Sequence, residues 1–174
     1  MSVTADIATS DETEVLLDLW QLYMKDLAEF RNSVVQADGR YRDDRLRTYL
    51  AYEEHWPFLI RLHGEMVGFA LVRKSKPGTH VIGEFFIKSE FRRSGIGGRA
   101  VAEILKRFVG NWEISFQEEN VKAAIFWRRT ISQLGFQATE VRLPVPDSPE
   151  LPHDVWLSFT TTDTQCFALL KSLT

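Results

Sequence analysis

The clearest chemical pattern of this 174-residue chain lies in the segment EFFIKSEFRRSGIGGRA, residues 84–100. An apolar run ends there in a basic, glycine-rich turn, after which the spacing of apolar residues predicts an amphipathic helix. The first amides of a helix have no intrahelical partner, and the helix dipole adds positive charge at that end. Glycines let a ligand approach the backbone closely. We therefore expect a phosphate or pyrophosphate site, built from Gly95, Gly97, Gly98, Arg92, Arg93 and Arg99.

The same segment has other interpretations. A glycine-rich turn with solvated arginines would bind nothing. Residues 95–100 also fit the dinucleotide pattern G-x-G-x-x-G/A, but in that fold the first glycine follows its strand almost directly. Here residues 88–94 intervene, and too little chain follows for the further parallel strands that such a fold needs. The phosphate-loop pattern G-x-x-x-x-G-K-[ST] is absent from the sequence.

The elements that must position this segment follow from the periodicity of apolar residues. Helical spacing predicts four helices, over about residues 12–30, 42–54, 95–109 and 120–134. Alternating patterns predict seven strands, in residues 2–8, 58–62, 67–71, 81–87, 112–116, 136–143 and 155–159. Residues 164–173 are ambiguous between helix and strand.

The resulting order, β-α-α-β-β-β-α-β-α-β-β, combines hairpins with helices between strands. This order predicts a mixed sheet flanked by helices, an α/β or α+β fold. The length fits a single domain over residues 1–174. The proline-rich stretch 144–152 lies between two strand-like runs, and we interpret it as a long loop inside that domain.

Composition narrows the class of protein. Apolar residues make up 44% and charged residues 26%, as in globular domains, and the net charge of −3 argues against broad nucleic-acid binding. The single cysteine, Cys166, excludes an intrachain disulfide, and the four histidines have no metal-ligand spacing, so we expect no metal. No window approaches the length of a membrane span, and residues 1–10 lack the features of a secretory signal. A cytoplasmic protein that contacts no membrane is expected.

Residues 92–97, RRSGIG, match position for position the Q/R-x-x-G-x-G/A motif of the GNAT family, the GCN5-related N-acetyltransferases. The preceding FFIKSEFR resembles the family's strand and lead-in. Downstream, Asn120, Ala123, Trp127 and the pair Gly135-Phe136 occupy the places of the family's N-x-x-A, aromatic and G-F features. The predicted element order is also similar to the GNAT order. The chain thus resembles this family over most of its length, and it looks like a subgroup of uncharacterised bacterial acetyltransferases.

The resemblance implies a mostly antiparallel GNAT-like sheet and acetyl-CoA as co-substrate. In the family, the turn amides wrap the pyrophosphate and the preceding strand pairs with the pantetheine arm. The strand role would fall to Ile87 and Lys88. The turn role would fall to Arg92, Arg93, Ser94, Gly95, Ile96, Gly97, Gly98 and Arg99. Asn120 would contact the cofactor arm, and its alternative role is a helix N-cap.

The reaction that the resemblance implies is direct attack of an amine on the thioester in a ternary complex. An alkylammonium has a pKa of about 10.4 in water, so it must lose a proton before it attacks. Glu84 is the best candidate base, because a charge in the apolar run GEFFI is hard to bury without a task or a partner. The alternative is a buried or edge glutamate that pairs with an arginine.

The thiolate that leaves in this reaction needs a proton or other stabilisation. The family often supplies a tyrosine where this chain has Trp127, whose indole N–H is no acid at accessible pH. Trp127 would instead pack against the cofactor arm or belong to the core. The proton would come from water, from the substrate ammonium, or from a residue elsewhere, such as Tyr23, Tyr49 or Tyr52.

The sequence leaves the acceptor open, as a small-molecule or peptide amine. The walls of its site are expected between residues 12 and 54 and in the loops near residues 115–118 and 144–154. A homodimer is compatible with the family. Two other function classes stay open: a non-catalytic acyl-CoA-binding regulatory module on the same fold, favoured by Trp127, and a phosphate- or nucleic-acid-binding module that uses the arginines of the turn.

Overall fold

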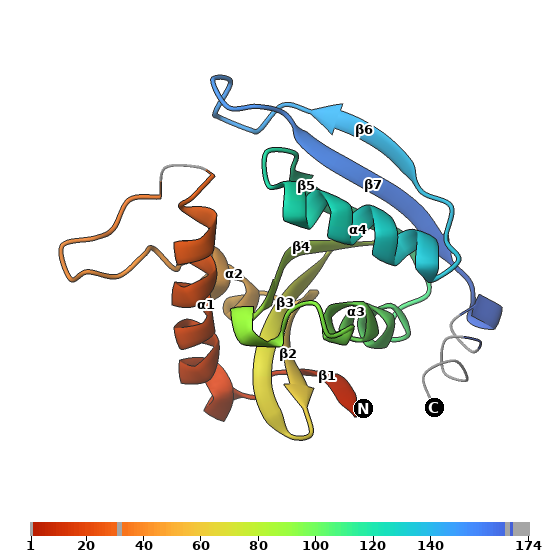
Figure 1. Ribbon diagram of the computed structural model, residues 1–174, viewed down its shortest axis with the longest axis horizontal. Helices are drawn as coiled ribbons and strands as arrows, with labels where there is room; N and C mark the ends of the chain where they lie inside the picture. The colour runs from red at the N-terminus through yellow and green to blue at the C-terminus, as the bar shows by residue number, and fades with distance from the viewer. Residues whose placement is uncertain (1, 31–32, 166–167, 169–174) are drawn as a thin grey trace. The chain divides into compact units, whose positions relative to one another are not determined.

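The computed structural model describes residues 2–30, 33–165 and 168 (Figure 1). In these residues a seven-stranded, mostly antiparallel sheet is combined with helices in the order that the sequence predicts. The GNAT-like α/β fold expected from the resemblance is thereby confirmed. The chain divides into two compact units, Met1–Arg73 with Glu84–Ala100 and Lys74–Gly83 with Val101–Thr174.

The first unit holds the amino-terminal elements and the end of the fourth strand. Strands β1 (Val3–Ile7), β2 (His55–Leu62) and β3 (Glu65–Lys76) pair as antiparallel neighbours, with Ala5 opposite Ile60 and Leu59 opposite Phe69. A 3-10 turn, η1 (Ser10–Glu12), precedes helix α1 (Thr13–Leu27), and helix α2 (Asp44–Ala51) follows. Strand β4 (Thr79–Ile87), the 3-10 turn η2 (Ser89–Phe91) and helix α3 (Ile96–Leu105) complete the order, although β3, β4 and α3 also contribute residues to the second unit.

Apolar periodicity explains how α1 is attached within this unit. Side chains at three- and four-residue spacing, Leu16, Leu19 and Trp20 among them, are buried on one face of α1. They pack into one cluster with Leu59 and Phe69 from the sheet. Tyr23 lies at the border of that cluster, where its ring packs edge-on against Phe69 at 5.5 Å. Packing against the core thus fixes the orientation of α1, and Tyr23 lies at the edge of its buried face.

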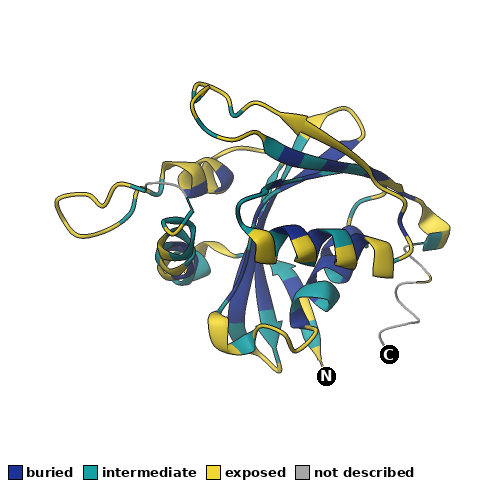
Figure 2. Ribbon diagram, turned by 45° about the horizontal axis from the view of Figure 1, so that its top comes forward, coloured by how far each residue is buried: buried dark blue, intermediate teal, exposed yellow. Residues whose placement is uncertain are grey.

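The second unit contains the carboxyl-terminal half of the sheet. Strand β5 (Gly110–Gln117) pairs in parallel with β4, from Thr79 opposite Asn111 to Ile82 opposite Ile114. Strand β7 (Asp154–Thr161) pairs antiparallel with β5 and with β6 (Thr139–Leu143), and helix α4 (Val121–Gln133) lies between β5 and β6 in the chain. Figure 2 shows dark blue, buried residues along these strands, whereas all five residues of β6 are exposed.

Several predicted boundaries differ from the structure by a few residues. Helix α2 ends at Ala51 because Tyr52 is extended, and α3 ends at Leu105. Strand β3 continues to Lys76, so only Pro77 and Gly78 separate it from β4, and Gly78 is in the left-handed region at φ 70°. Residues 144–153 form the predicted loop between β6 and β7. Cys166 and most of the ambiguous segment 164–173 lie outside the described residues.

Candidate active site

The turn expected to bind phosphate, residues 88–99, connects β4 to α3 within the first unit. We call it the phosphate turn. Two of its residues, Arg93 and Gly95, have left-handed backbone conformations, at φ 61° and 83°. Turns of this kind collect backbone N–H groups into concave sites for anions. Residues 92–95 are exposed, so ligands can reach the turn.

Helix α3 begins at the end of the phosphate turn. The hydroxyl of Ser94 donates to the carbonyl of Phe91 at 2.6 Å, and the amide of Arg99 donates to the carbonyl of Gly95 at 3.2 Å. The amides of Ile96, Gly97 and Gly98 precede this first helical bond, so they are the free donors of the helix start. The side chain of Ile96 is buried, which anchors this start. The glycines, the first amides of the helix and the arginines thus lie in one segment, and their binding of phosphate stays a prediction.

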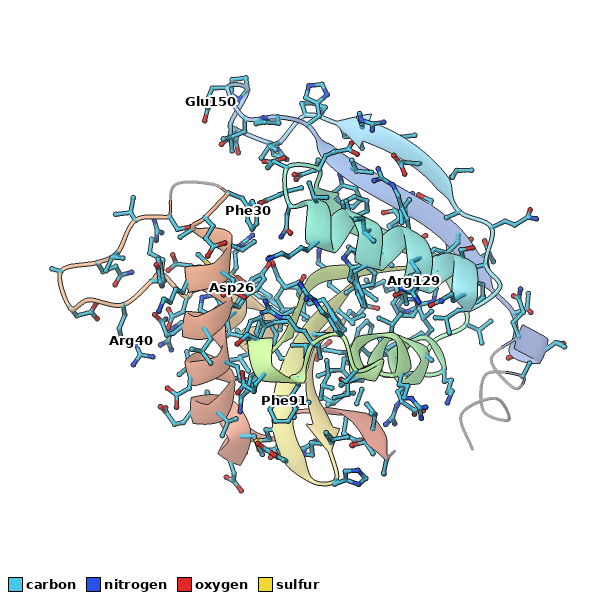
Figure 3. All side chains as sticks on the ribbon, in the orientation of Figure 1. Asp26, Phe30, Arg40, Phe91, Arg129 and Glu150 are labelled. Carbon is cyan, nitrogen blue, oxygen red and sulfur yellow. The ribbon has the colours of Figure 1, made fainter. Side chains whose placement is uncertain are left out.

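The side chain of Arg92 turns back toward the strand. Its Nε donates to the carbonyl oxygen of Ile87 at 2.6 Å, and its Nη2 pairs with the carboxylate of Asp26 on α1. The guanidinium carbon also lies over the Phe86 ring, 5.4 Å from its centroid. Figure 3 labels Asp26 on α1 and Phe91 in the turn. Arg92 thus has several protein partners, whereas the sequence pattern predicts its side chain as part of a phosphate site.

The backbone at the end of β4 is partly engaged within the protein. The amide of Lys88 donates to the carbonyl of Val67 at 2.9 Å, and the carbonyl of Lys88 accepts from the amide of Phe91 at 3.0 Å. The carbonyl of Ile87 accepts from Arg92. Of the two residues predicted to pair with a pantetheine arm, Lys88 therefore already uses both of its backbone groups.

Glu84 lies on β4 with a side chain that is only 9% exposed. The hydroxyl of Tyr23 donates to its Oε2, and Nη1 of Arg45 lies 2.9 Å from its Oε1. The ion pair compensates the burial of the carboxylate. Burial and the charge of Glu84 raise the pKa of Tyr23 well above 10, so this hydroxyl keeps its proton and remains a donor. The predicted pairing of Glu84 with an arginine is present, together with a tyrosine that the sequence did not connect to it.

The other two tyrosines named as proton donors differ in their surroundings. Burial raises the pKa of Tyr49 to about 12, and its ring packs edge-on against His55 at 5.0 Å. Tyr52 is 65% exposed and follows the last residue of α2. With pKa values above that of free tyrosine, Tyr23 and Tyr49 are poor acids for a thiolate.

Asn120 and Trp127 lie on the second unit. The Oδ1 of Asn120 accepts from the amide of Ala123 at 3.1 Å, which is the N-cap bond that the sequence offered as its alternative role. Trp127 is 5% exposed, and its ring lies 4.9 Å from that of Phe126. Both residues thus have structural roles in α4, and their contact with a cofactor stays a prediction.

A charged cluster in the second unit holds the loop before α4. Arg128 of α4 pairs with Glu118 at 2.9 Å and with Glu140 at 2.8 Å, and it lies over the Phe116 ring at 5.3 Å. Arg142 also pairs with Glu118 at 2.5 Å. The arginine partners lower the pKa of both glutamates. In this part of the expected acceptor wall, the charges of the glutamates are therefore balanced by arginines of the same protein.

Hollows occur in both units of the described structure. One of about 360 Å³ in the first unit is lined by Trp20, Met24, Arg42, Asp44 and Arg45. The other, of about 770 Å³, lies in the second unit and includes residues of β5, β7 and the loop before β6. The first hollow includes Arg45, the ion-pair partner of Glu84, whereas Glu84 itself does not line it.

Metal-ligand groups and membrane spans are both lacking in the part of the chain that the structure describes. No group of three or more histidine, cysteine, aspartate or glutamate side chains is placed to hold a metal ion there. None of the described helices is both long and apolar enough to cross a bilayer.

Sequence reasoning missed two residues, Asp26 and Arg45. Asp26 follows Tyr23 by one helical turn, so the two share a side of α1. This i, i+3 spacing beside an apolar stripe was the available signal for Asp26. For Arg45 no such signal existed, because it is one of four arginines within residues 40–47.

The chain is similar to known acetyltransferases. A family model described as "Acetyltransferase (GNAT) family" matches residues 16–131, and no curated protein matches. The aminoglycoside acetyltransferase AAC(6')-Ib, solved with coenzyme A, is 18% identical over 98% of this chain and 99% of its own, with a TM-score of 0.68. An acetyltransferase from Thermus thermophilus is 17% identical over 91% and 96%, with a TM-score of 0.62.

A third solved structure is that of an acyl-homoserine lactone synthase. The CoA-dependent acyl-homoserine lactone synthase MesI is 13% identical over 98% of this chain and 94% of its own, with a TM-score of 0.64. At these identities the likeness shows a shared fold. The family model covers more than half of the sequence. The chain therefore belongs to the GNAT acetyltransferase family, and it is an acyltransferase by family.

Proposed function

We propose that this protein transfers an acetyl group from acetyl-CoA to an amine by direct attack in a ternary complex. The observation that carries the proposal is the phosphate turn, where the amides of Ile96, Gly97 and Gly98 begin α3 directly after the left-handed Gly95. A helix start of this kind binds phosphate oxygens. The solved AAC(6')-Ib structure, which shares the fold, contains coenzyme A.

The pantetheine arm would pair with the edge of β4. The ladder of β4 with β5 ends at Ile82, so it does not use the backbone groups of residues 84–87. An extended arm can add to such an edge as a further strand does. Because Lys88 already uses its amide and carbonyl, the contact is proposed at Ile87 and the residues before it.

Glu84 is proposed as the base. The substrate ammonium gives one proton to the Glu84 carboxylate, and the resulting amine nitrogen forms a bond to the thioester carbonyl carbon. The carbon–sulfur bond then breaks, and the nitrogen loses its second proton to the leaving thiolate, directly or through water. Each oxygen of a carboxylate has two acceptor sites, so the Glu84 carboxylate can accept a proton while Tyr23 and Arg45 contact it. Tyr23 and Arg45 would hold its geometry.

The leaving thiolate is proposed to take its proton from water or from the substrate ammonium. Trp127 has only an indole N–H donor, and the pKa values of Tyr23 and Tyr49 lie above that of free tyrosine. Tyr52 is mostly exposed beyond the end of α2, and it is not assigned this role.

The acceptor is proposed as a small-molecule or peptide amine. Solved proteins of this fold act on different acceptors: one was solved with kanamycin, and another is a ribosomal-protein-alanine N-acetyltransferase from Brucella melitensis. The hollow of about 360 Å³ beside Arg45 is the proposed entry for the amine. A bacterial source, a cytoplasmic location, a homodimer and a single domain are parts of the same proposal.

Two measurements test the function. Calorimetric titration of the full chain with acetyl-CoA should show saturable binding, and absence of binding at hundreds of micromolar would reject the proposal. Thiol release from acetyl-CoA should then be followed with a broad panel of amines, including aminoglycosides, polyamines and peptides with free amino termini.

The alternative is a non-catalytic acyl-CoA-binding module on the same fold. Trp127 in place of the tyrosine common in the family favours it. Such a module would bind acetyl-CoA in the titration but would release no thiol with any amine. Turnover that depends on Glu84 would exclude it.

A further inference from the structure

We infer that the Arg92 side chain is a positioning group for the phosphate turn, and that Asp26 on α1 controls acetyl-CoA affinity by holding it. The inference rests on the proposed function, because it takes residues 88–99 as the cofactor site. It assigns Asp26 a role that the family motif does not contain. It also changes the role of Arg92 from phosphate ligand to brace.

The contacts of Arg92 connect three elements of the first unit. Its Nε binds the carbonyl of Ile87 at 2.6 Å, at the last residue of β4. Its Nη2 pairs with Asp26 on α1, and its planar group covers the Phe86 ring at 5.4 Å. An arginine engaged through two of its nitrogens and one face has little freedom to follow a ligand.

Helix α1 contacts this region at two points. Tyr23 reaches Glu84 on β4, and Asp26, one helical turn later, reaches Arg92 after the strand. The ring of Tyr23 also lies 6.0 Å from the ring of Phe86, and the guanidinium of Arg92 lies over that same Phe86 ring. The helix therefore fixes both the carboxylate and the beginning of the phosphate turn.

The turn needs such a constraint. Arg93 is a non-glycine residue at φ 61°, a left-handed conformation that is unfavourable for a residue with a Cβ. A strained backbone conformation of this kind persists where contacts with the surrounding structure hold it in place. Arg92 immediately precedes Arg93, so its bonds to Ile87 and Asp26 fix the chain where the left-handed residue begins.

A phosphate contact by the same guanidinium predicts a different result. If Arg92 binds phosphate, Asp26 competes with the ligand, and its removal should leave the affinity unchanged or increase it. If Arg92 is a brace, loss of Asp26 should weaken binding as loss of Arg92 does. The two variants therefore have to be compared with each other and in combination.

The test is calorimetric titration of the full-length variants Arg92→Ala, Asp26→Asn and the double variant with acetyl-CoA. We expect each single change to raise Kd about tenfold and the double change to raise it no further, because both remove the same brace. The dependence of Kd on ionic strength should remain that of wild type in all three. Glu113→Gln, which removes the partner of Lys76 in the second unit, is the matched control and should bind as wild type.

Three outcomes would overturn the inference: Asp26→Asn that binds as wild type or more tightly, additive losses in the double variant, or a weaker salt dependence in Arg92→Ala. If Asp26→Asn fails to fold, Asp26→Ser, which also removes the ion pair with Arg92, replaces it and should raise Kd equally. Gly97→Glu distinguishes failure of the proposed cofactor site from failure of the inference about Asp26 and Arg92. If Gly97→Glu binds acetyl-CoA as wild type does, the phosphate turn itself is misassigned. If Gly97→Glu does not bind acetyl-CoA while Asp26→Asn binds it as wild type does, only the positioning role of Arg92 and Asp26 is rejected.

Discussion

The phenolic hydroxyl of Tyr23 donates its hydrogen bond to Oε2 of Glu84, across 61 positions of sequence. Arg45 holds the other carboxylate oxygen at 2.9 Å. A buried carboxylate with two such partners has a fixed orientation, and a fixed orientation is what a base needs to meet one proton of a bound amine. The contacts of Tyr23 and Arg45 with Glu84 therefore support specific predictions about Glu84 as the base.

Replacement of Glu84 by glutamine should remove the proton acceptor while it retains the size of the side chain. We expect kcat to fall by about 10²–10⁴-fold, the range for loss of a positioned general base. The Kd for acetyl-CoA should stay close to that of wild type. Thiol release at saturating amine measures kcat, and calorimetry measures Kd.

Glu12→Gln is the matched control for this experiment. Glu12 also pairs with an arginine, Arg61, and accepts the amide of Thr9 at 3.0 Å, in the same unit of the protein. Its loss should reduce the stability of the N-terminal turn without an effect on turnover. A Glu84→Gln enzyme with kcat within twofold of wild type would show that the proton leaves by another route.

A negative charge in the phosphate turn should abolish cofactor binding. Gly97 belongs to the first turn of α3, so Gly97→Glu places a carboxylate where phosphate oxygens are expected. Gly97→Ala adds only a methyl group and improves helix propensity, so it separates bulk from charge. Titration with acetyl-CoA should give no detectable binding for the glutamate variant and a measurable Kd for the alanine variant, with the helical signal of both retained.

Much of the fold could be predicted because the sequence alternates cleanly between two periods. The strands around Gly64 and the helix that begins near Gly95 both appear where the apolar spacing changes. The ends were less accurate. Tyr52 is extended at the end of α2, although nothing before Pro57 in the sequence marks that stop. Helix ends depend on cap contacts that the periodicity of apolar residues does not encode.

The candidate site was predicted in part. Local motifs locate the phosphate turn, because its free amides arise within one segment. The partners of Glu84 and Arg92 come from α1 and α2, more than 35 residues away in sequence. Such pairings follow from how helices pack on the sheet, and a single sequence gives no signal for them. For Asn120, the cap bond to Ala123 was one of the two roles expected from its place at a helix start.

The raised pKa of Tyr49 predicts a loss of stability at alkaline pH. In the unfolded chain the phenol ionises near 10, whereas in the folded protein it keeps its proton up to about 12. Between these values the folded state binds more protons than the unfolded state, so the free energy of unfolding falls as pH rises. A pKa difference of about two corresponds to roughly 3 kcal/mol in total.

Tyr49→Phe should remove this part of the alkaline loss. Urea unfolding at intervals from pH 8 to 11.5, with tyrosinate absorbance recorded in parallel, measures the slope. Below pH 9 the slopes of variant and wild type should coincide, and above pH 10 the variant should have the shallower one. Equal slopes above pH 10 would mean that Tyr49 ionises in the folded protein as it does in water.

Gly68 on β3 should tolerate no side chain, although it has an ordinary backbone conformation. A Cβ at this position would lie 2.1 Å from the carbonyl oxygen of Phe86 and 3.1 Å from Cα of Ile87. Both are backbone atoms, so the end of β4 would have to move. We expect Gly68→Ala to lower the free energy of unfolding by roughly 3 kcal/mol, because overpacking against backbone cannot relax by a rotamer change.

Gly64→Ala is the comparison that separates the two ways in which a glycine is required. Gly64 lies at φ 89° in the turn between β2 and β3, and a Cβ there meets nothing within 4 Å. Its replacement should cost only about 1 kcal/mol, from the left-handed conformation alone. Because β4 carries both Glu84 and the entry to the phosphate turn, Gly68→Ala should also weaken acetyl-CoA binding in calorimetry, whereas Gly64→Ala should not. Equal effects of the two variants on stability and on Kd would contradict the close approach of β3 to the end of β4.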